Sequence, residues 1–215
     1  MRDSPGPGRL VALAVCLLLG GCAAALELAN RQPPDLYALT PKSTFEEALP
    51  EVDARLTIEV PTATAGLNTA RIALRPTPTT LQYYAAAAWI DVLPVMVQNL
   101  LIESFDNVGA IDVLGREVVG VRADYGLLTH IREFQAEYAS PGAAPVIRVR
   151  LQARLIRLPR RTSLAATSAE AFVQAQATSV AAIVRAFDEA FDKATKRVVE
   201  WTTRELATAT DVPPA

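Results

Sequence analysis

Cysteine and histidine are the scarcest reactive residues of this sequence. Its 215 residues include two cysteines and one histidine. Cys16 and Cys22 both lie near the N-terminus, so the chain after residue 22 contains no thiol. A disulfide or a thiolate metal site is therefore excluded from that part, and the lack of His and Cys clusters disfavours zinc. Stability must come from ordinary burial of side chains, since 51% of the residues are hydrophobic.

Recognisable catalytic motifs are missing as well. The chain contains no G-x-S-x-G, P-loop, H-E-x-x-H or G-x-G-x-x-G pattern. His130 stands in a strand-like segment, and the acidic pair Glu46 and Glu47 is interpreted as solvated. The sequence leaves a Ser-His-Asp triad open, because its members come from distant positions. We predict that the protein is not an enzyme and holds no metal.

The sequence also lacks an excess of positive charge and a long hydrophobic run. Its formal net charge is −2, which argues against binding to nucleic acid, because such binding needs a basic surface. The apolar run at residues 10–19 would cover only about half of a bilayer core, since a helix rises about 1.5 Å per residue. This run is therefore too short to span a membrane.

The N-terminus does contain the pattern of an exported protein. Arg2 and Arg9 come before the apolar run, and small residues follow it, which is the order of a signal peptide. Leu19-Gly20-Gly21-Cys22 resembles the bacterial lipobox, in which the cysteine carries diacylglycerol and, after cleavage, an N-acyl chain. The alternative is an ordinary signal peptide followed by an accidental cysteine. We predict lipidation at Cys22, no other cofactor, and a stable membrane anchor.

The chain is predicted to consist of four parts. Residues 1–21 are the signal peptide, 22–34 a lipidated tether, 35–208 a single domain and 209–215 a disordered tail. The residue after Cys22 is Ala23 and not Asp. By resemblance to lipoproteins of Gram-negative bacteria, this residue favours the outer membrane, with the domain on its periplasmic face.

Periodicity predicts the fold of the domain. Residues 55–60 and 147–155 alternate between apolar and polar side chains, as strands do. A first helix is expected after an N-cap at Asp91, ending before Gly109, and a second from residue 178 or 179 to about 207. Further strands are expected at residues 36–39, 72–75, 81–84, 111–114, 125–131 and 163–172, with a bulge near Arg132 and Glu133. We predict an α+β two-layer sandwich of a mostly antiparallel sheet with two main helices on one face.

Three arginines on the polar side of one strand are candidates for contact with a partner or a lipid. Arg148, Arg150 and Arg154 share that face, and guanidinium groups bind oxyanions such as lipid phosphates well. The alternative, which we favour, is that the arginines pair across the sheet with glutamates. The glutamates in question are Glu133, Glu137 and Glu170.

An aromatic group supplies the second set of candidates. Tyr83, Tyr84 and Trp89 lie within seven positions of one another. They are either part of the core beside the first helix or an anchor for a partner, as interface hot spots are. The sequence favours neither interpretation.

Several segments together resemble one family. They are RIALRP at residues 71–76, LQYY at 81–84, WIDVLP at 89–94, ADYGLL at 123–128, REFQAE at 132–137, AFDEA at 186–190 and VEW at 199–201. In order and spacing, these segments are similar to the ABC-type transport auxiliary lipoproteins, a family that includes the lipoprotein of the paraquat-inducible system. The resemblance covers residues 35–201 and adds to that of the lipobox.

The resemblance implies a function and partners. Members accompany ABC permeases, ATPases and MCE-domain (mammalian cell entry) proteins that move lipids between the inner and outer membranes. It therefore implies a non-enzymatic, lipid-anchored outer-membrane component that docks a periplasmic MCE assembly, with phospholipid contact and a homo-oligomer left open. The alternative is a structural envelope lipoprotein that touches no lipid cargo. A hydrophobic groove between helices and sheet would favour direct lipid contact, whereas a wet surface would favour docking.

Overall fold

The computed structural model describes residues 33–45, 48–115 and 122–210. The chain divides into two units, Met1–Pro34 and Asp35–Ala215, and the second contains nearly all of the described residues. The predicted signal peptide, Cys22, most of the tether and residues 211–215 lie outside them. Within the described residues, no helix combines the length and hydropathy that a bilayer crossing requires.

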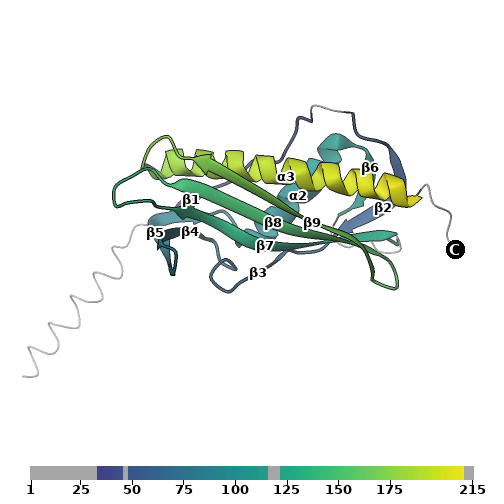
Figure 1. The fold of residues 1–215 in the computed structure, drawn as a ribbon, viewed down its shortest axis with the longest axis horizontal. Helices are drawn as coiled ribbons and strands as arrows, with labels where there is room; N and C mark the ends of the chain where they lie inside the picture. The colour runs from purple at the N-terminus through teal and green to yellow at the C-terminus, as the bar shows by residue number, and fades with distance from the viewer. Residues whose placement is uncertain (1–32, 46–47, 116–121, 211–215) are drawn as a thin grey trace, which may run out of the picture. The chain divides into compact units, whose positions relative to one another are not determined.

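The described residues between 35 and 210 form a nine-stranded sheet and two helices (Figure 1). The elements are β1 (Asp35–Tyr37), β2 (Val52–Ile58), β3 (Thr62–Ala63), β4 (Arg71–Thr77), β5 (Thr80–Trp89), α2 (Leu93–Val108), β6 (Ile111–Leu114), β7 (Tyr125–Glu137), β8 (Val146–Arg157), β9 (Thr162–Gln174) and α3 (Val180–Thr210). The α+β sandwich with two helices is confirmed.

The sheet is built around β7. One edge of this strand pairs with β8 along its whole length, and β8 pairs with β9, so that β7–β8–β9 is a continuous antiparallel meander. Three short strands share the other edge of β7 in parallel: β2 at its start, β3 in its middle and β4 at its end. The expected bulge is present between Ile131 and Glu133. The long pairings are thus antiparallel, as predicted.

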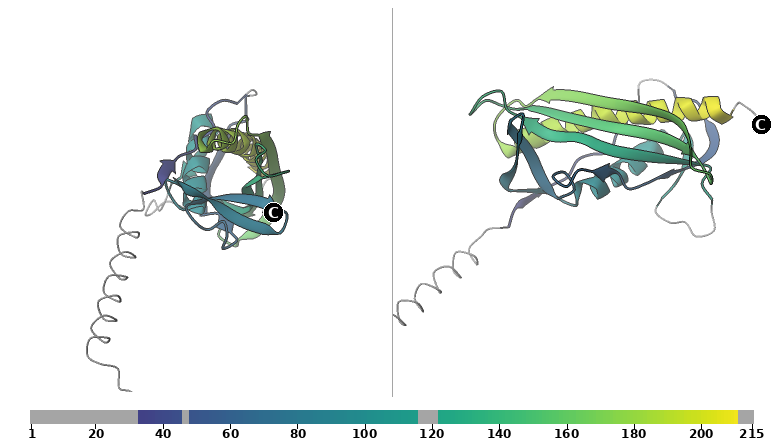
Figure 2. Two further views of the ribbon diagram at one scale, coloured as in Figure 1. Left: turned by 90° about the vertical axis from the view of Figure 1, so that its left-hand side faces the viewer. Right: turned by 60° about the horizontal axis from the view of Figure 1, so that its bottom comes forward.

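Both helices pack on the same face of the sheet. α3 lies along β8 and β9 and reaches β2, while α2 packs on β6 and β2. Figure 2 shows the sheet curving around that face. The inner side chains of β9 include Ala169, Ala171 and Val173. Because these side chains are small, the long helix can approach the strand closely.

A cluster of aromatic rings fills the space between the helices and the sheet. Trp89, Phe134 and Phe187 are each at most 2% exposed. The Trp89 ring meets Phe134 and Phe187 edge-on, with centroid distances of 6.0 and 5.3 Å, and Phe191 lies 6.1 Å from Phe134. Such pairs add to the stabilisation that burial provides. The interior of the domain is therefore occupied by its own side chains.

The start of α2 differs from the prediction. The N-cap is Val92 and not Asp91, and no side chain caps the helix. The carboxylate of Asp91 instead accepts a hydrogen bond from the neighbouring Val92 N–H at 2.6 Å, so it cannot reach the second or third amide of the helix. Pro94 does lie in the first turn, and Gly109 ends the helix with φ 65°, a left-handed conformation that favours glycine.

Several elements are longer than the sequence predicted. β5 continues through Ala85–Ala88 to Trp89 and contains Ala86 with a positive φ of 52°. β4 includes Pro76, which lies between the paired positions Leu74 and Thr77, where the register shifts. A proline is tolerated there because no ladder hydrogen bond is needed. α3 extends through Thr210, two residues beyond the expected end of the domain.

Candidate functional surface

The outer face of the β7–β8–β9 meander carries the three arginines among the predicted site residues. Along β8, Ile147, Val149 and Leu151 are fully buried against the helices. The residues between them point to the other side of the sheet, since side chains alternate along a strand. Arg148, Arg150, Gln152 and Arg154 therefore share the face that is turned away from the helices. This alternation is as predicted.

Two of the three arginines are neutralised by glutamates of the neighbouring strands. Arg148 Nε donates to Glu170 Oε1 at 2.8 Å, its Nη2 lies 2.8 Å from the same oxygen, and its Nη1 lies 3.7 Å from Glu137. Arg150 Nη2 donates to Glu133 Oε1 at 3.0 Å. The pairing that the sequence favoured is present for Arg148 and Arg150.

Further polar contacts tie this cluster together. Gln135 is 2% exposed and donates from Nε2 to Glu133 Oε2 at 2.7 Å and to Glu137 Oε1 at 2.9 Å. Arg75 of β4 lies 3.6 Å from Glu133. Arg197 of α3 donates to the main-chain oxygen of Glu170 on β9. Arg75, Arg148 and Arg150 thus face three glutamates, and the formal charge of the cluster is balanced.

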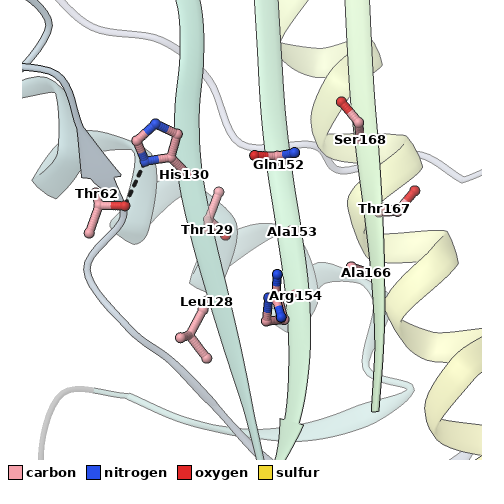
Figure 3. Close-up of a pocket in the computed structure, with 10 residues that line it drawn as sticks. All are labelled: Thr62, Leu128, Thr129, His130, Gln152, Ala153, Arg154, Ala166, Thr167 and Ser168. Carbon is pink, nitrogen blue, oxygen red and sulfur yellow. Dashed lines mark hydrogen bonds between the residues drawn. The ribbon is translucent and has the colours of Figure 1, made fainter. Parts of the chain in front are cut away.

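Arg154 lies in a different environment at the other end of this face. It lines a hollow of about 450 Å³ together with Leu128, His130, Gln152, Ser168 and Thr62 (Figure 3). We call this the Arg154 hollow. Within residues 33–45, 48–115 and 122–210, no hydrogen bond or ion pair reaches the Arg154 guanidinium. Arg154 thus differs from Arg148 and Arg150, which are paired with glutamates.

The other polar side chains of the Arg154 hollow are held in place by neighbours. Arg132 Nε donates to Gln152 Oε1 at 2.9 Å, and Thr62 Oγ1 lies 2.8 Å from His130 Nδ1. Partial burial, and next the positive charge of Arg132, lower the pKa of His130 below its ordinary value of 6.5. The imidazole is therefore neutral at neutral pH.

The aromatic candidates are distributed between the core and the domain edge. Trp89 is 2% exposed and belongs to the core. Tyr83 donates to the Gly66 carbonyl at 3.0 Å, and the Arg71 guanidinium lies 3.8 Å from the centre of its ring. Tyr84 shares a 2.8 Å hydrogen bond with Tyr138, and burial and this bond raise the pKa of Tyr84 well above its usual range.

Further surface features of the domain include another hollow and an exposed apolar edge. A hollow of about 560 Å³ lies beside Glu51, Asp53 and Asp112, and Asp112 is 3.6 Å from Arg55. Across the described part of the chain, no group of three or more His, Cys, Asp or Glu side chains is arranged to hold a metal ion. Leu36 and Ile90 are 64% and 58% exposed, at the edge where β1 pairs with β5.

The sequence did not predict that the residues of the Arg154 hollow lie together. It singled out Arg154, but it did not bring His130, Gln152, Ser168 and Thr62 to the same place. The alternation along β8 could have added Gln152. The others come from β3, β7 and β9, and their proximity depends on strand register.

The α+β fold of this domain is shared with proteins whose crystal structures are known. A crystal structure of a Xanthomonas campestris protein of family DUF330 matches with a TM-score of 0.77 and 27% identity, covering 83% of this chain and 99% of that one. The crystal structure of an uncharacterized protein matches with a TM-score of 0.61 at 10% identity, covering 80% of this chain and 99% of that one, and it supports the fold alone.

Comparison of the sequence identifies the family. The family of the ABC-type transport auxiliary lipoprotein component matches residues 37–199. The chain belongs to this family, and the resemblance noted from residues 35–201 is confirmed. Its family is therefore one of lipoproteins with an accessory role in ABC-type transport.

One curated relative is an uncharacterized protein of Bradyrhizobium diazoefficiens. It is 32% identical to this chain over 166 residues, which cover 77% of this chain and 44% of the relative. The chain thus spans less than half the length of that relative.

Proposed function

We propose that this protein is an outer-membrane-anchored periplasmic component of an ABC-type lipid transport system. It is held in the outer membrane by lipid on Cys22 and docks an MCE-domain protein that works with the permease and ATPase. The observation that carries the proposal is the family match over residues 37–199, which follows a lipobox-like sequence ending at Cys22. The function is that of an accessory and involves no catalysis.

The packing of the domain supports docking rather than transport of lipid inside it. A carrier needs an apolar cavity that buries most of its ligand. Here the space between the helices and the sheet is filled by Trp89, Phe134, Phe187 and Phe191. The Arg154 hollow has a lining of mixed polar and apolar side chains and lies on the opposite face. The protein would therefore hold or orient the transport assembly, while acyl chains pass elsewhere.

The proposal is tested by purifying the full-length lipoprotein from envelope membranes of its own bacterium after mild cross-linking. Mass spectrometry is expected to recover an MCE-domain protein together with ABC permease or ATPase subunits. The Cys22→Ser variant, which cannot be acylated, serves as the matched control and should recover much less of them. Recovery of other outer-membrane proteins without any MCE or ABC component would instead support the structural role.

The anchor and its location have separate tests. Cys22→Ser should abolish acylation and move the protein from the membrane fraction to the soluble fraction, because two or three acyl chains provide the anchoring free energy. A variant that stays in the membrane at the wild-type level would refute the lipidation. Ala23→Asp, with Cys22 intact, should move the lipoprotein from outer-membrane to inner-membrane fractions of a density gradient. Unchanged outer-membrane distribution would refute the sorting argument.

A further inference from the structure

The Arg154 hollow is lined by hydrogen-bond donors and contains no carboxylate. Its ten lining residues include one charged side chain, Arg154, and no Asp or Glu. A short distance along β8, Arg148 and Arg150 are both matched by glutamates. Among the described residues, Arg154 has no such counterion. Guanidinium groups bind carboxylate and phosphate oxygens well, so an arginine without an acidic partner is suited to an oxyanion.

Several side chains around Arg154 can donate hydrogen bonds. The carbonyl oxygen of Gln152 already accepts a hydrogen bond from Arg132, so its amide nitrogen remains available to donate. Figure 3 shows this nitrogen on the side of Ser168, whose hydroxyl is a further donor. His130 is neutral, and its Nδ1 lies 2.8 Å from the Thr62 hydroxyl. When Nδ1 accepts from Thr62, the imidazole proton is on Nε2.

The spacing of these donors suits a single small anion. Gln152 and Ser168 are direct partners across β8 and β9, and Arg154 faces Ala166 in the next position on the same side. Direct partners have Cβ atoms about 5 Å apart, and same-face neighbours on one strand are about 7 Å apart. One tetrahedral oxyanion can bridge donors at such separations with hydrogen bonds of about 2.9 Å. The small side chain of Ala166 leaves room for it.

We propose that the Arg154 hollow is a binding site for a phosphate group, held by Arg154, Gln152 and Ser168. The phosphate belongs either to a lipid headgroup or to a free phosphate ester, since both present the same oxygens. The hollow measures about 450 Å³, which is enough for a headgroup but leaves the acyl chains outside. This site does not depend on the proposed transport role, because the argument uses only the side chains that line the hollow.

The single histidine of the chain provides a direct reporter. His130 lines the hollow and is the one histidine among the 215 residues. The full-length lipoprotein is purified in maltoside detergent with a histidine-free affinity tag, and its imidazole signal is followed by proton NMR at constant pH. Inorganic phosphate and glycerol 3-phosphate are titrated separately, and acetate at equal ionic strength is the control anion. Saturable movement of the signal with either phosphate, and none with acetate, is expected.

Two variants link the signal to the proposed donors. Arg154→Gln is expected to weaken phosphate binding about tenfold or more, because it removes a charge-assisted hydrogen bond to the anion. Arg160→Gln removes the same charge from the exposed turn between β8 and β9 and should leave the affinity unchanged. Ser168→Ala should weaken binding less than Arg154→Gln. Circular dichroism checks that each variant is folded.

The outcomes separate the two sources of phosphate and can overturn the site. Binding of phosphatidylglycerol nanodiscs, reduced by Arg154→Gln but not by Arg160→Gln, identifies a lipid headgroup. Binding of glycerol 3-phosphate without any dependence of nanodisc binding on Arg154 identifies a soluble ester. No saturable shift with either phosphate, equal shifts with acetate, or equal affinity in Arg154→Gln would refute the site.

Discussion

Trp89 offers the sharpest test of the domain's interior. The sequence left open whether this side chain is a surface anchor or part of the core, and the structure has it 2% exposed between Phe134 and Phe187. Trp89→Ala would remove a side chain that buries about 150 to 250 Å². The loss of transfer free energy and the cavity left behind together cost about 3 to 5 kcal/mol. Since a domain is typically stable by about 5 to 15 kcal/mol, this loss is large.

Urea unfolding of the full-length lipoprotein in detergent, followed by far-ultraviolet circular dichroism, measures the effect. With a slope of about 2 kcal/mol per molar urea, the midpoint should fall by about 2 M. Trp201→Ala is a matched control, because Trp201 on α3 is only partly buried, and its midpoint should fall less. Trp89→Phe keeps most of the ring packing and should cost about 1 to 2 kcal/mol.

The result that would refute this reasoning is a Trp89→Ala protein with an unchanged midpoint. If such a variant also lost its partners in the cross-linking experiment, Trp89 would be a surface anchor. A destabilised variant that still recovers MCE and ABC components whenever it is folded would support the core role. The stability measurement and the partner measurement therefore distinguish the two interpretations that the sequence left open.

Three further predictions concern the outer face and one strained residue. Glu170→Gln should lower the free energy of unfolding by about 1 kcal/mol, and less at high salt, because Glu170 accepts a hydrogen bond from Arg148 and forms an ion pair with it while remaining partly exposed; an equal loss at high salt would contradict the charge argument. The pKa of His130 is lowered on folding, so the unfolded chain binds more protons below about pH 6.5 and stability falls as the pH falls through this range. Urea midpoints of His130→Gln should show a weaker decline there, and an identical decline would assign it to other groups. Ala86→Gly should raise the free energy of unfolding by about 0.5 to 1 kcal/mol, because Ala86 has a positive φ of 52°, whereas Ala85→Gly should lower it in the same urea assay.

The regular elements could be predicted because their side chains repeat with a clear period. Strand β8 alternates from Val146 to Arg157, and its inner and outer faces are as expected. Helix α3 repeats its apolar residues at three and four positions. The pattern is strong in these elements because one face is buried and the other is exposed to solvent.

Strand β3 and the alanine-rich end of β5 could not be predicted from the sequence. β3 has two residues, Thr62 and Ala63, too few to show a period. The end of β5 runs through four alanines, which carry no contrast between apolar and polar faces. Both are strands because a neighbour offers hydrogen bonds: β7 pairs with β3, and β1 pairs with β5 at Ala87, Ala88 and Trp89. Their structure is set by tertiary contact.

Strand register explains why the three arginines of β8 differ in chemistry. Arg150 faces Glu133 on one side and Glu170 on the other, so its charge is matched. Arg154 faces Leu128 and Ala166, neither of which can pair with it. The bulge between Ile131 and Glu133 lies between these two positions and shifts the register of β7 by one residue. A one-residue shift exchanges the two faces of a strand. Because of the bulge, Glu133 lies on the outer face and pairs with Arg150. The sequence of β8 alone shows similar arginines, whereas the paired strands make Arg150 part of an ion-pair network and leave Arg154 available to an anion.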